Sequence, residues 1–445
     1  MNKLHTGTLK SYRPNLFFIL GLAGAISLAA WTETSQDEFT FLASSDDIVA
    51  TDTTPLLLSE HRPLTSSEIQ AAHTAWSYIE SNTNWSTGLV NSVDGYPSTT
   101  LWEIGSYIFA LIASEKLSIT DPNEFDRRTN LLLGSLGRIG LFEGLLPNKA
   151  YHTQTLEMVT YENEISIDGL GWSALDVMRC LLALQALVET NPQYRPQVQQ
   201  LVSRWDLTAL SSSGRLVGAD RETDDGSIRF VQEGRIGYEQ YGARTAMRLG
   251  LDAASAASAN SIVDWNEQFG HNVPIDRRSA KKFGAINPTL SEPYILMGLE
   301  LGWDNESEIL ASHIYRSMEA RFLNTGQLTM LSEDHINQNP YFLYGSLYSN
   351  GREWAVVDED GVDHSELRTV SLKASFGWHA LFDTDYTASA LDQLAELYSP
   401  QKGWMAGQYE QDNRANDIFS LNSNAVVLEA IHYRQFGPFL TPNNL

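Results

Sequence analysis

Two kinds of helical segment alternate along this chain, and the alternation limits the folds that it can adopt. Six segments are amphipathic and charged, and we place them at 66–81, 123–138, 195–205, 253–269, 306–321 and 388–398. Six others are apolar or rich in small residues, and we place them at 100–116, 171–189, 238–251, 292–301, 371–382 and 421–433. An apolar helix must be covered on all sides, whereas an amphipathic helix needs cover on one side only. The alternation therefore predicts an all-α fold, an (α/α)6 barrel of six inner helices ringed by six outer helices.

The lengths of the connections predict where the functional site lies. A connection from an inner helix to the next outer helix takes only a few residues, whereas the return takes roughly 15 to 50 residues, well above the usual loop length. In an antiparallel ring, all of these long segments fall on the face where the inner helices begin. Long loops over one end of a rigid barrel usually carry function, so we expect the site at that end.

The first residues have the pattern of an export signal. Lys3, Lys10 and Arg13 precede the apolar run "NLFFILGLAGAISLAAW". This predicts a signal peptide or signal anchor at 1–30, followed by a polar flexible linker at 31–65. The barrel would span 66–437, and 438–445 would form a tail. We therefore expect an exported bacterial protein, periplasmic or secreted, that touches a membrane only through an uncleaved anchor.

Composition and missing motifs exclude several functions. The net charge is −25, which would repel the phosphates of a nucleic acid, so no nucleic-acid partner is expected. The sequence contains no G-x-S-x-G, Walker A or G-x-G-x-x-G motif, and it has a single cysteine, Cys180, in an apolar helical run. We therefore expect no disulfide, no metal and no cofactor, and a buried Cys180. Many of its aromatic residues lie beside Gly, Asn and Asp in loops, which suits a carbohydrate partner of a monomeric protein.

The stretch "STTLWEIGSY" places a carboxylate in the first turn of an apolar helix. Glu103 follows Trp102 and precedes Tyr107 by four residues, so Glu103 and Tyr107 share a helix face. A first-turn glutamate is stabilised by the helix dipole. Glu103 is therefore either a capping residue or a catalytic acid.

The next inner helix carries a second candidate carboxylate. In "GWSALDVMR", Trp172, Asp176 and Arg179 form one stripe, and we place Asp176 well inside the helix. A buried carboxylate is costly without partners. Asp176 therefore either pairs with Arg179 or faces a polar cavity.

The third long loop ends in a dense polar cluster, "RFVQEGRIGYEQYGA". It contains Glu233 and Arg235 just before an inner helix, and Tyr238 and Tyr241 on one face of that helix. We take Glu233 as a third catalytic candidate. The expected substrate-binding residues from all of these segments are Trp102, Tyr107, Tyr151, Trp172, Arg179, Arg235, Tyr238, Tyr241, Trp378 and Trp404.

Several long motifs of the chain resemble a known family. They are "TLWEIGSYIFALIASEKLSI", "GLLPNKAYHTQT", "GWSALDVMRCLLAL", "VQEGRIGYEQYGAR", "KASFGWHALF" and "GWMAGQYE". Together they resemble, over about residues 70–435, a bacterial envelope family with a "domain of unknown function" that is grouped with six-hairpin glycosidases. This resemblance implies the (α/α)6 fold and a glycosidase activity, and members usually carry Asp where this chain has Glu103.

A more distant likeness is to inverting (α/α)6 endoglucanases of the cellulase type. "LWEIGSY" is similar to the segment that carries their catalytic acid, and "ALDVMR" to the segment that carries their base. The likeness implies Glu103 as general acid and Asp176 as general base. Leu175 stands where those enzymes have an aromatic residue.

These observations lead to one main hypothesis and two alternatives. The main hypothesis is a glycoside hydrolase that cleaves a polysaccharide or oligosaccharide, with a β-glucan expected, by carboxylate acid/base chemistry with inversion favoured. The first alternative is a polysaccharide lyase with Tyr238 as base and Arg235, Lys149 and Lys373 as a clamp for a uronate. The second is a glycan-binding envelope protein without catalytic activity.

Overall fold

The computed structural model describes residues 56–222 and 225–440. Its α-helices are α2 Ser66–Asn82, α3 Leu101–Lys116, α4 Pro122–Leu136, α5 Ala174–Thr190, α6 Arg195–Val202, α7 Tyr238–Arg248, α8 Ala280–Phe283, α9 Glu292–Leu296, α10 Asn305–Thr325, α11 Leu372–Phe382, α12 Asp385–Leu394 and α13 Leu421–Phe436. Helix α9 continues directly into a π-helical turn, η3 Met297–Leu301. Short 3-10 turns are η1 Pro192–Tyr194, η2 Leu207–Leu210 and η4 Ser365–Leu367.

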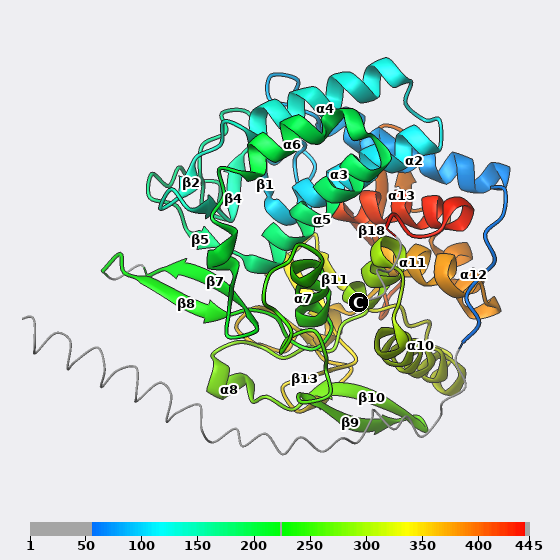
Figure 1. Cartoon of the computed structure of the whole chain (residues 1–445). Helices are drawn as coiled ribbons and strands as arrows, with labels where there is room; N and C mark the ends of the chain where they lie inside the picture. The colour runs from blue at the N-terminus through cyan, green and yellow to red at the C-terminus, as the bar shows by residue number, and fades with distance from the viewer. Residues whose placement is uncertain (1–55, 223–224, 441–445) are drawn as a thin grey trace, which may run out of the picture. The chain divides into compact units, whose positions relative to one another are not determined.

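Six of these helices close a ring. Each of α3, α5, α7, α9, α11 and α13 contacts the next, and α13 contacts α3 again. Helices α2, α4, α6, α10 and α12 pack outside this ring, against α13, α3, α5, α9 and α11 respectively (Figure 1). The predicted helical ring is therefore present, with the inner and outer helices in the expected order.

One predicted outer helix is absent, and the prediction for 253–269 is wrong. Residues 253–262 form turns, and β9 Val263–Gln268 pairs with β10 His271–Asp276 as a hairpin. The connecting residues Phe269 and Gly270 both have positive φ, 51° and 81°, which is typical of a tight hairpin turn. The run "AASAASANS" has no large apolar side chain to bury, so nothing favours an amphipathic helix there. Strand β10 packs against α10 and occupies the gap in the outer layer.

The fold also contains more β-structure than an all-α fold would. The other strands are β1 Ser98–Thr100, β2 Leu141–Phe142, β3 Leu146–Pro147, β4 Ala150–His152, β5 Gly171–Trp172, β6 Ser211–Ser212, β7 Arg215–Arg221, β8 Ile228–Gln232, β11 Glu333–His335, β12 Phe342–Gly345, β13 Tyr348–Ser349, β14 Arg352–Glu353, β15 Val356–Val357, β16 Thr369–Ser371, β17 Tyr398–Ser399, β18 Gly403–Tyr409 and β19 Ala415–Phe419. They lie in the long connections that lead into the inner helices. All the pairings are antiparallel, and the larger sheets are β5–β7–β6 with β8 on β7, β16–β18–β17 with β19 on β18, and β11–β12–β15.

Strands β1, β5, β16 and β19 run almost directly into inner helices α3, α5, α11 and α13. The residues that cap these four helices, Thr100, Ser173, Ser371 and Ser420, all accept a hydrogen bond from the first turn through their hydroxyls. A side-chain hydroxyl at this position satisfies an amide that has no partner inside the helix. The paired strand holds the capping residue in place, so the first-turn side chains of the inner helices have defined positions.

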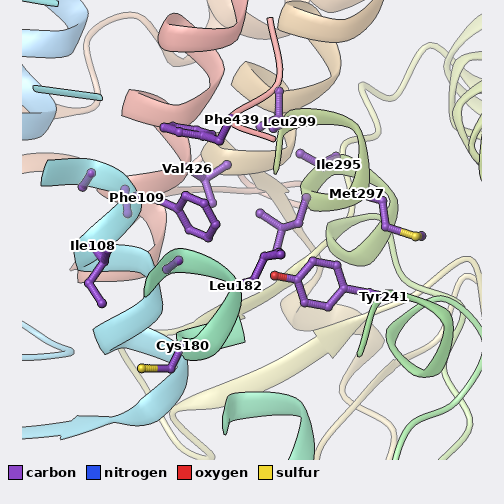
Figure 2. Close-up of a cluster of buried hydrophobic side chains, with 14 of the residues drawn as sticks. Ile108, Phe109, Cys180, Leu182, Tyr241, Ile295, Met297, Leu299, Val426 and Phe439 are labelled. Carbon is purple, nitrogen blue, oxygen red and sulfur yellow. The ribbon is translucent and has the colours of Figure 1, made fainter. Parts of the chain in front are cut away.

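The centre of the ring is apolar and closely packed. Figure 2 shows side chains from α3, α5, α7, α9, η3 and α13 converging, among them Phe109, Leu182 and Val426. Cys180 is fully buried in this cluster, as the sequence predicts.

Both ends of the described chain contact the ring. In the predicted linker, the amide of Ser59 donates to the carbonyl of Leu381 at 2.8 Å and that of Arg62 to Arg434 at 2.9 Å. In the predicted tail, Phe439 is buried against the core. The predicted leader, 1–30, lies outside the described residues. Among those described, no helix combines the length and the apolar character that crossing a membrane requires.

Candidate active site

A cavity of about 480 Å³ opens on the face where the inner helices begin, as the connection lengths predict. Its wall carries the carboxyl groups of Glu103, Asp176, Asp220, Glu233, Glu292, Glu333 and Asp334. Its basic residues are Arg229, Arg235, His335 and Lys373, and its aromatic residues are Trp102, Tyr238, Phe283, Phe342 and Tyr344. The three carboxylates singled out in the sequence thus face the same space, as do Trp102, Arg235 and Tyr238.

Asp176 and Glu233 share one hydroxyl group. Ser173 Oγ lies 2.9 Å from Asp176 Oδ1 and 3.2 Å from Glu233 Oε2. Asp176 is in the first turn of α5, not well inside the helix as predicted, because Gly171 and Trp172 form strand β5 and the helix starts only at residue 174. The capping residue Ser173 therefore links the two carboxyl groups.

Burial and the neighbouring carboxylate favour the protonated form of Asp176. Burial raises the pKa of Asp176 to about 7, Glu233 and Glu103 raise it in the same direction, and the Ser173 hydrogen bond opposes them. Ser173 has a single hydroxyl proton and can donate to only one carboxyl oxygen at a time. A protonated Asp176 removes this competition, because it can donate to Ser173 Oγ while Ser173 donates to Glu233.

Glu233 is held by the start of α5 and by a gap in strand β7. Its Oε2 accepts a hydrogen bond from the backbone amide of Leu175 at 3.0 Å. Burial nevertheless raises the pKa of Glu233, against this hydrogen bond. A Cβ atom on Gly218 would lie far too close to Glu233 Oε1, so the carboxylate occupies space that only glycine leaves open.

Glu103 has the capping geometry that the sequence left as one of two alternatives. Its side chain accepts hydrogen bonds from the Thr100 amide, at 3.3 Å, and from the Thr100 hydroxyl, while its own amide donates back to Thr100. This is a capping box. Glu103 also lines the cavity and remains half-buried, so capping does not remove it from the site.

Two aromatic rings form a wall beside these carboxylates. The rings of Trp102 and Tyr238 meet edge to face with centroids 5.4 Å apart. The Tyr238 hydroxyl donates to Glu333 on β11, and the Arg179 guanidinium lies 4.5 Å from the centroid of the Trp102 ring. The wall therefore joins residues of three inner helices to one of the loop strands.

Arg179 and Tyr241 belong to the ring interior and do not line the cavity. Arg179 is fully buried and bonds Glu300 at 3.0 Å and Glu429 at 3.1 Å. The Tyr241 hydroxyl donates to Glu300 at 2.5 Å. A buried arginine requires such partners, so this cluster stabilises the ring beneath the site.

The other predicted substrate-binding residues also lie away from the cavity. Trp172 is buried and donates to the Val217 carbonyl at 3.0 Å, and Tyr151 is buried and donates to Gly140 at 2.7 Å. Tyr107 and Trp378 are core residues, and Trp404 borders a separate groove beside α2. These side chains point inward because the apolar core of the ring, not the cavity, surrounds them. The structure therefore gives these residues no place in the cavity wall.

The sequence analysis missed the acidic residues of strand β11. Glu333 and Asp334 lie in "SEDHI", within the connection that runs from α10 to α11. A pair of acids in a long loop resembles a solvated surface segment, and only the pairing of β11 with β12 brings it to the cavity. The sequence feature that could have revealed this pair is its position in a long loop-face connection, where Phe342 and Tyr344 follow it in the sequence.

The chain belongs to the family described as protein of unknown function (DUF3131), whose model matches residues 70–437. A search of the curated proteins found no match.

Solved structures share the fold at low sequence identity. A Bacteroides fragilis protein provisionally described as a glucoamylase is 11% identical, with a TM-score of 0.60, and the match covers 84% of this chain and 93% of that one. An endo-β-1,2-glucanase from Chitinophaga pinensis, in complex with sophorotriose and glucose, is 11% identical with a TM-score of 0.58 and coverages of 84% and 93%. An endo-β-1,2-glucanase from Talaromyces funiculosus, in complex with sophorose, is 10% identical with a TM-score of 0.52 and coverages of 82% and 83%.

Proposed function

We propose that this protein is a glycoside hydrolase that cleaves a glucan within the cavity, and that a β-linked glucan is its substrate. The observation that carries the proposal is the pair formed by Asp176 and Glu233 on one serine hydroxyl, in a cavity walled by aromatic rings. Glycoside hydrolysis needs one carboxylic acid that is protonated near neutral pH and one carboxylate that is ionised. The glucanases among the structural neighbours support β-1,2-linked glucan as the first substrate to test.

The pKa values favour Asp176 as the proton donor. A carboxylic acid with a pKa of about 7 can still hold its proton at neutral pH and release it to a leaving oxygen. The carboxyl group of Glu103 is engaged at the start of α3 as a cap. The sequence analysis took Asp176 as the general base and Glu103 as the general acid. We propose instead that Asp176 is the general acid and that Glu103 binds a sugar hydroxyl beside it.

The aromatic wall provides faces for sugar rings. Trp102, Phe342 and Tyr344 line the cavity with their rings, and the apolar faces of a pyranose pack against such surfaces. The carboxylates then accept hydrogen bonds from the sugar hydroxyls. A neutral glucan fits this wall better than a uronate does, since acidic residues outnumber basic ones.

The lyase alternative is less well supported by the cavity. The amine of Lys373 is already paired with Glu292 and lies 3.7 Å from Asp334, so it is not free to hold a uronate carboxylate. Tyr238 donates its hydroxyl to Glu333. The base and two of the three clamp residues of the lyase hypothesis are thus engaged with carboxylates, because Lys149 also pairs with Asp220.

The proposed activity is tested with defined substrates. The full chain is incubated with linear β-1,2-, β-1,3-, β-1,4- and α-1,4-glucans, and release of reducing ends is measured beside Asp176→Asn. We expect release from a β-linked glucan and a loss of about 1,000-fold in D176N, the usual size of a general-acid contribution. Binding without release would support the non-catalytic alternative, and unsaturated, ultraviolet-absorbing products from a uronate polymer would support the lyase.

The export signal also remains a proposal. We propose that residues 1–30 direct the chain out of the cytoplasm and that the barrel acts as a monomer in the periplasm or outside the cell. Sequencing the N-terminus of the mature protein, together with cell fractionation, tests this. An intact N-terminus in the cytoplasmic fraction would contradict export.

A further inference from the structure

A second group of charged side chains lies on the opposite side of the ring from Asp176. Asp334 is on strand β11, and Lys373 is in the first turn of α11. In the closed ring of inner helices, α5 is second and α11 is fifth, so their starts lie across the ring from one another. Asp334 and Lys373 nevertheless line the same cavity as Asp176. The cavity therefore has carboxyl groups on two facing walls.

Asp334 is buried without the hydrogen bonds that a buried carboxyl group requires. Its side chain is 4% exposed. Within the described residues, neither of its oxygens accepts a hydrogen bond of normal geometry, although the Ser371 hydroxyl lies near enough to lower its pKa. Buried polar atoms are nearly always bonded to protein or water, so an exception in a cavity indicates a water or ligand partner.

A lysine amine lies beside Asp334 in the cavity wall. Lys373 Nζ lies 3.7 Å from Asp334 Oδ1 and also pairs with Glu292 on α9. Asn422 on α13 donates to Glu292 at 2.7 Å, which fixes this pair in place. Lys373 lowers the pKa of Asp334, whereas the neighbouring Glu233 raises the pKa of Asp176.

Burial is the larger effect on this carboxyl group. It raises the pKa of Asp334 to about 7, as it does that of Asp176. At Asp334, Glu292 and Glu333 act in the same direction, and Lys373 and Ser371 oppose them. Burial lowers the pKa of Lys373, but Glu292, Asp334 and Glu333 raise it by more, so the ammonium form persists at neutral pH. A sugar that brings hydroxyl donors to Asp334 would shift the balance further toward the carboxylate.

We propose that Asp334 is the general base of the reaction and that it activates the water that attacks the anomeric carbon. The inference rests on the proposed glycosidase function and specifies its mechanism. The Asp334 carboxylate takes a proton from the water while the water oxygen bonds to the anomeric carbon. The bond from that carbon to the leaving oxygen breaks, its electron pair stays on the oxygen, and Asp176 supplies the proton. The product has the inverted configuration, and proton exchange with solvent restores both carboxyl groups.

In this mechanism, Lys373 is a positioning residue. It does not need to touch the sugar, and its positive charge lowers the pKa of Asp334 against the effect of burial. Replacing Lys373 by Met should move the acidic limb of the kcat/KM profile to higher pH. A residue with only a structural role would lower stability and leave the position of that limb unchanged.

The test compares two variants on two substrates. Asp176→Asn and Asp334→Asn are assayed on the glucan and on an aryl glycoside of the same sugar, whose dinitrophenolate leaving group needs no proton. We expect D176N to lose about 1,000-fold on the glucan and to remain within about ten-fold of wild type on the aryl glycoside. We expect D334N to lose about 1,000-fold on both. Asp264→Asn, an exposed aspartate on β9, is the matched control and should leave both rates unchanged.

Azide gives a second readout that does not depend on the aryl substrate. Azide is added to Asp334→Ala, where it can enter in place of the activated water without needing a base. We expect it to restore turnover and to form a glycosyl azide of inverted configuration. D334N that keeps wild-type rates, or that recovers on the aryl glycoside alone, would overturn the assignment while the glycosidase function stands. A wild-type protein that cleaves no glucan would instead overturn the proposed function.

Discussion

At the scale of single residues, the site depends on one glycine as much as on its acids. Gly218 leaves the space that the Glu233 carboxylate fills, and Glu233 in turn reaches the start of α5. No feature of the sequence near Gly218 indicated this, because residues 218 and 233 meet only through the pairing of β7 with β8. Glu103, Asp176 and Glu233 could be predicted as cavity residues, since each lies near the start of an inner helix, but the depth of Asp176 in its helix could not.

Replacing Gly218 by Ala should lower activity without unfolding the protein. The added methyl group meets the end of a flexible side chain, so Glu233 moves and the backbone does not need to. We expect kcat/KM to fall at least about ten-fold, because a displaced Glu233 no longer holds Ser173 and the start of α5, which position Asp176. Gly134→Ala is the control. Gly134 lies in α4, and a Cβ atom there would meet no described atom within 4 Å. G134A should keep full activity and gain about 0.5–1 kcal/mol in free energy of unfolding.

The proton on Asp176 predicts a pH dependence of stability. The folded protein holds this proton up to about pH 7, whereas the unfolded chain loses it near pH 3.8. Ionisation of Asp176 therefore reduces stability as the pH rises between those values. Asp176→Asn cannot ionise, so its free energy of unfolding should rise relative to that of wild type from pH 4 to pH 8, by on the order of 4 kcal/mol. A difference that stays constant across this range would show that Asp176 is not protonated in the folded state.

At the scale of elements, the repeated unit of the site is a short strand, a hydroxyl cap and an inner helix. The helical pattern predicted these helices, but not the strands before them. Strands β1, β5 and β16 are two or three residues long and pair with strands far away in the sequence, and such pairing leaves no local signal. Asp334 lies on β11, a three-residue strand in the middle of a long connection, which is too short to show an alternating pattern.

Two capping boxes of the same type allow the capping role of Glu103 to be tested separately from a role in the reaction. Glu68 caps α2 with Thr65 as Glu103 caps α3 with Thr100, but Glu68 lies outside the cavity. Glu68→Gln and Glu103→Gln should each lose about 0.5–1 kcal/mol of stability from the weakened cap, and E68Q somewhat more because Glu68 also pairs with Arg62. Only E103Q should lower kcat/KM, by at least about ten-fold. Equal activity of both variants would reduce Glu103 to a cap.

At the scale of the whole molecule, the described chain ends by packing into the ring. Phe439 lies beyond the family match, which ends at residue 437. Its ring stacks on His432 with centroids 4.0 Å apart and lies 5.0 Å from Phe109. Sequence analysis assigned this segment to a tail, because two apolar residues near a terminus form no period. Phe439 packs on side chains of α3 and α13 together, so its contacts depend on the folded ring and cannot be predicted from the local sequence.

Phe439→Ala should therefore destabilise the protein while leaving its chemistry intact. Loss of a buried phenylalanine leaves a cavity and costs about 3–5 kcal/mol. Urea denaturation measures the change, and kcat at 25 °C should remain within two-fold of wild type because Phe439 is distant from the cavity wall. Exposed Phe436→Ala is the control and should change stability by less than about 0.5 kcal/mol.

The account as a whole depends on acid and base acting from facing walls of one cavity. Proton NMR of a fresh wild-type digest of a β-linked glucan tests this most directly, because it records which anomer of the reducing end appears first. The account predicts that the α-anomer appears first and then mutarotates. A β-anomer in the first spectra, or a glucan left intact after prolonged incubation, would contradict it.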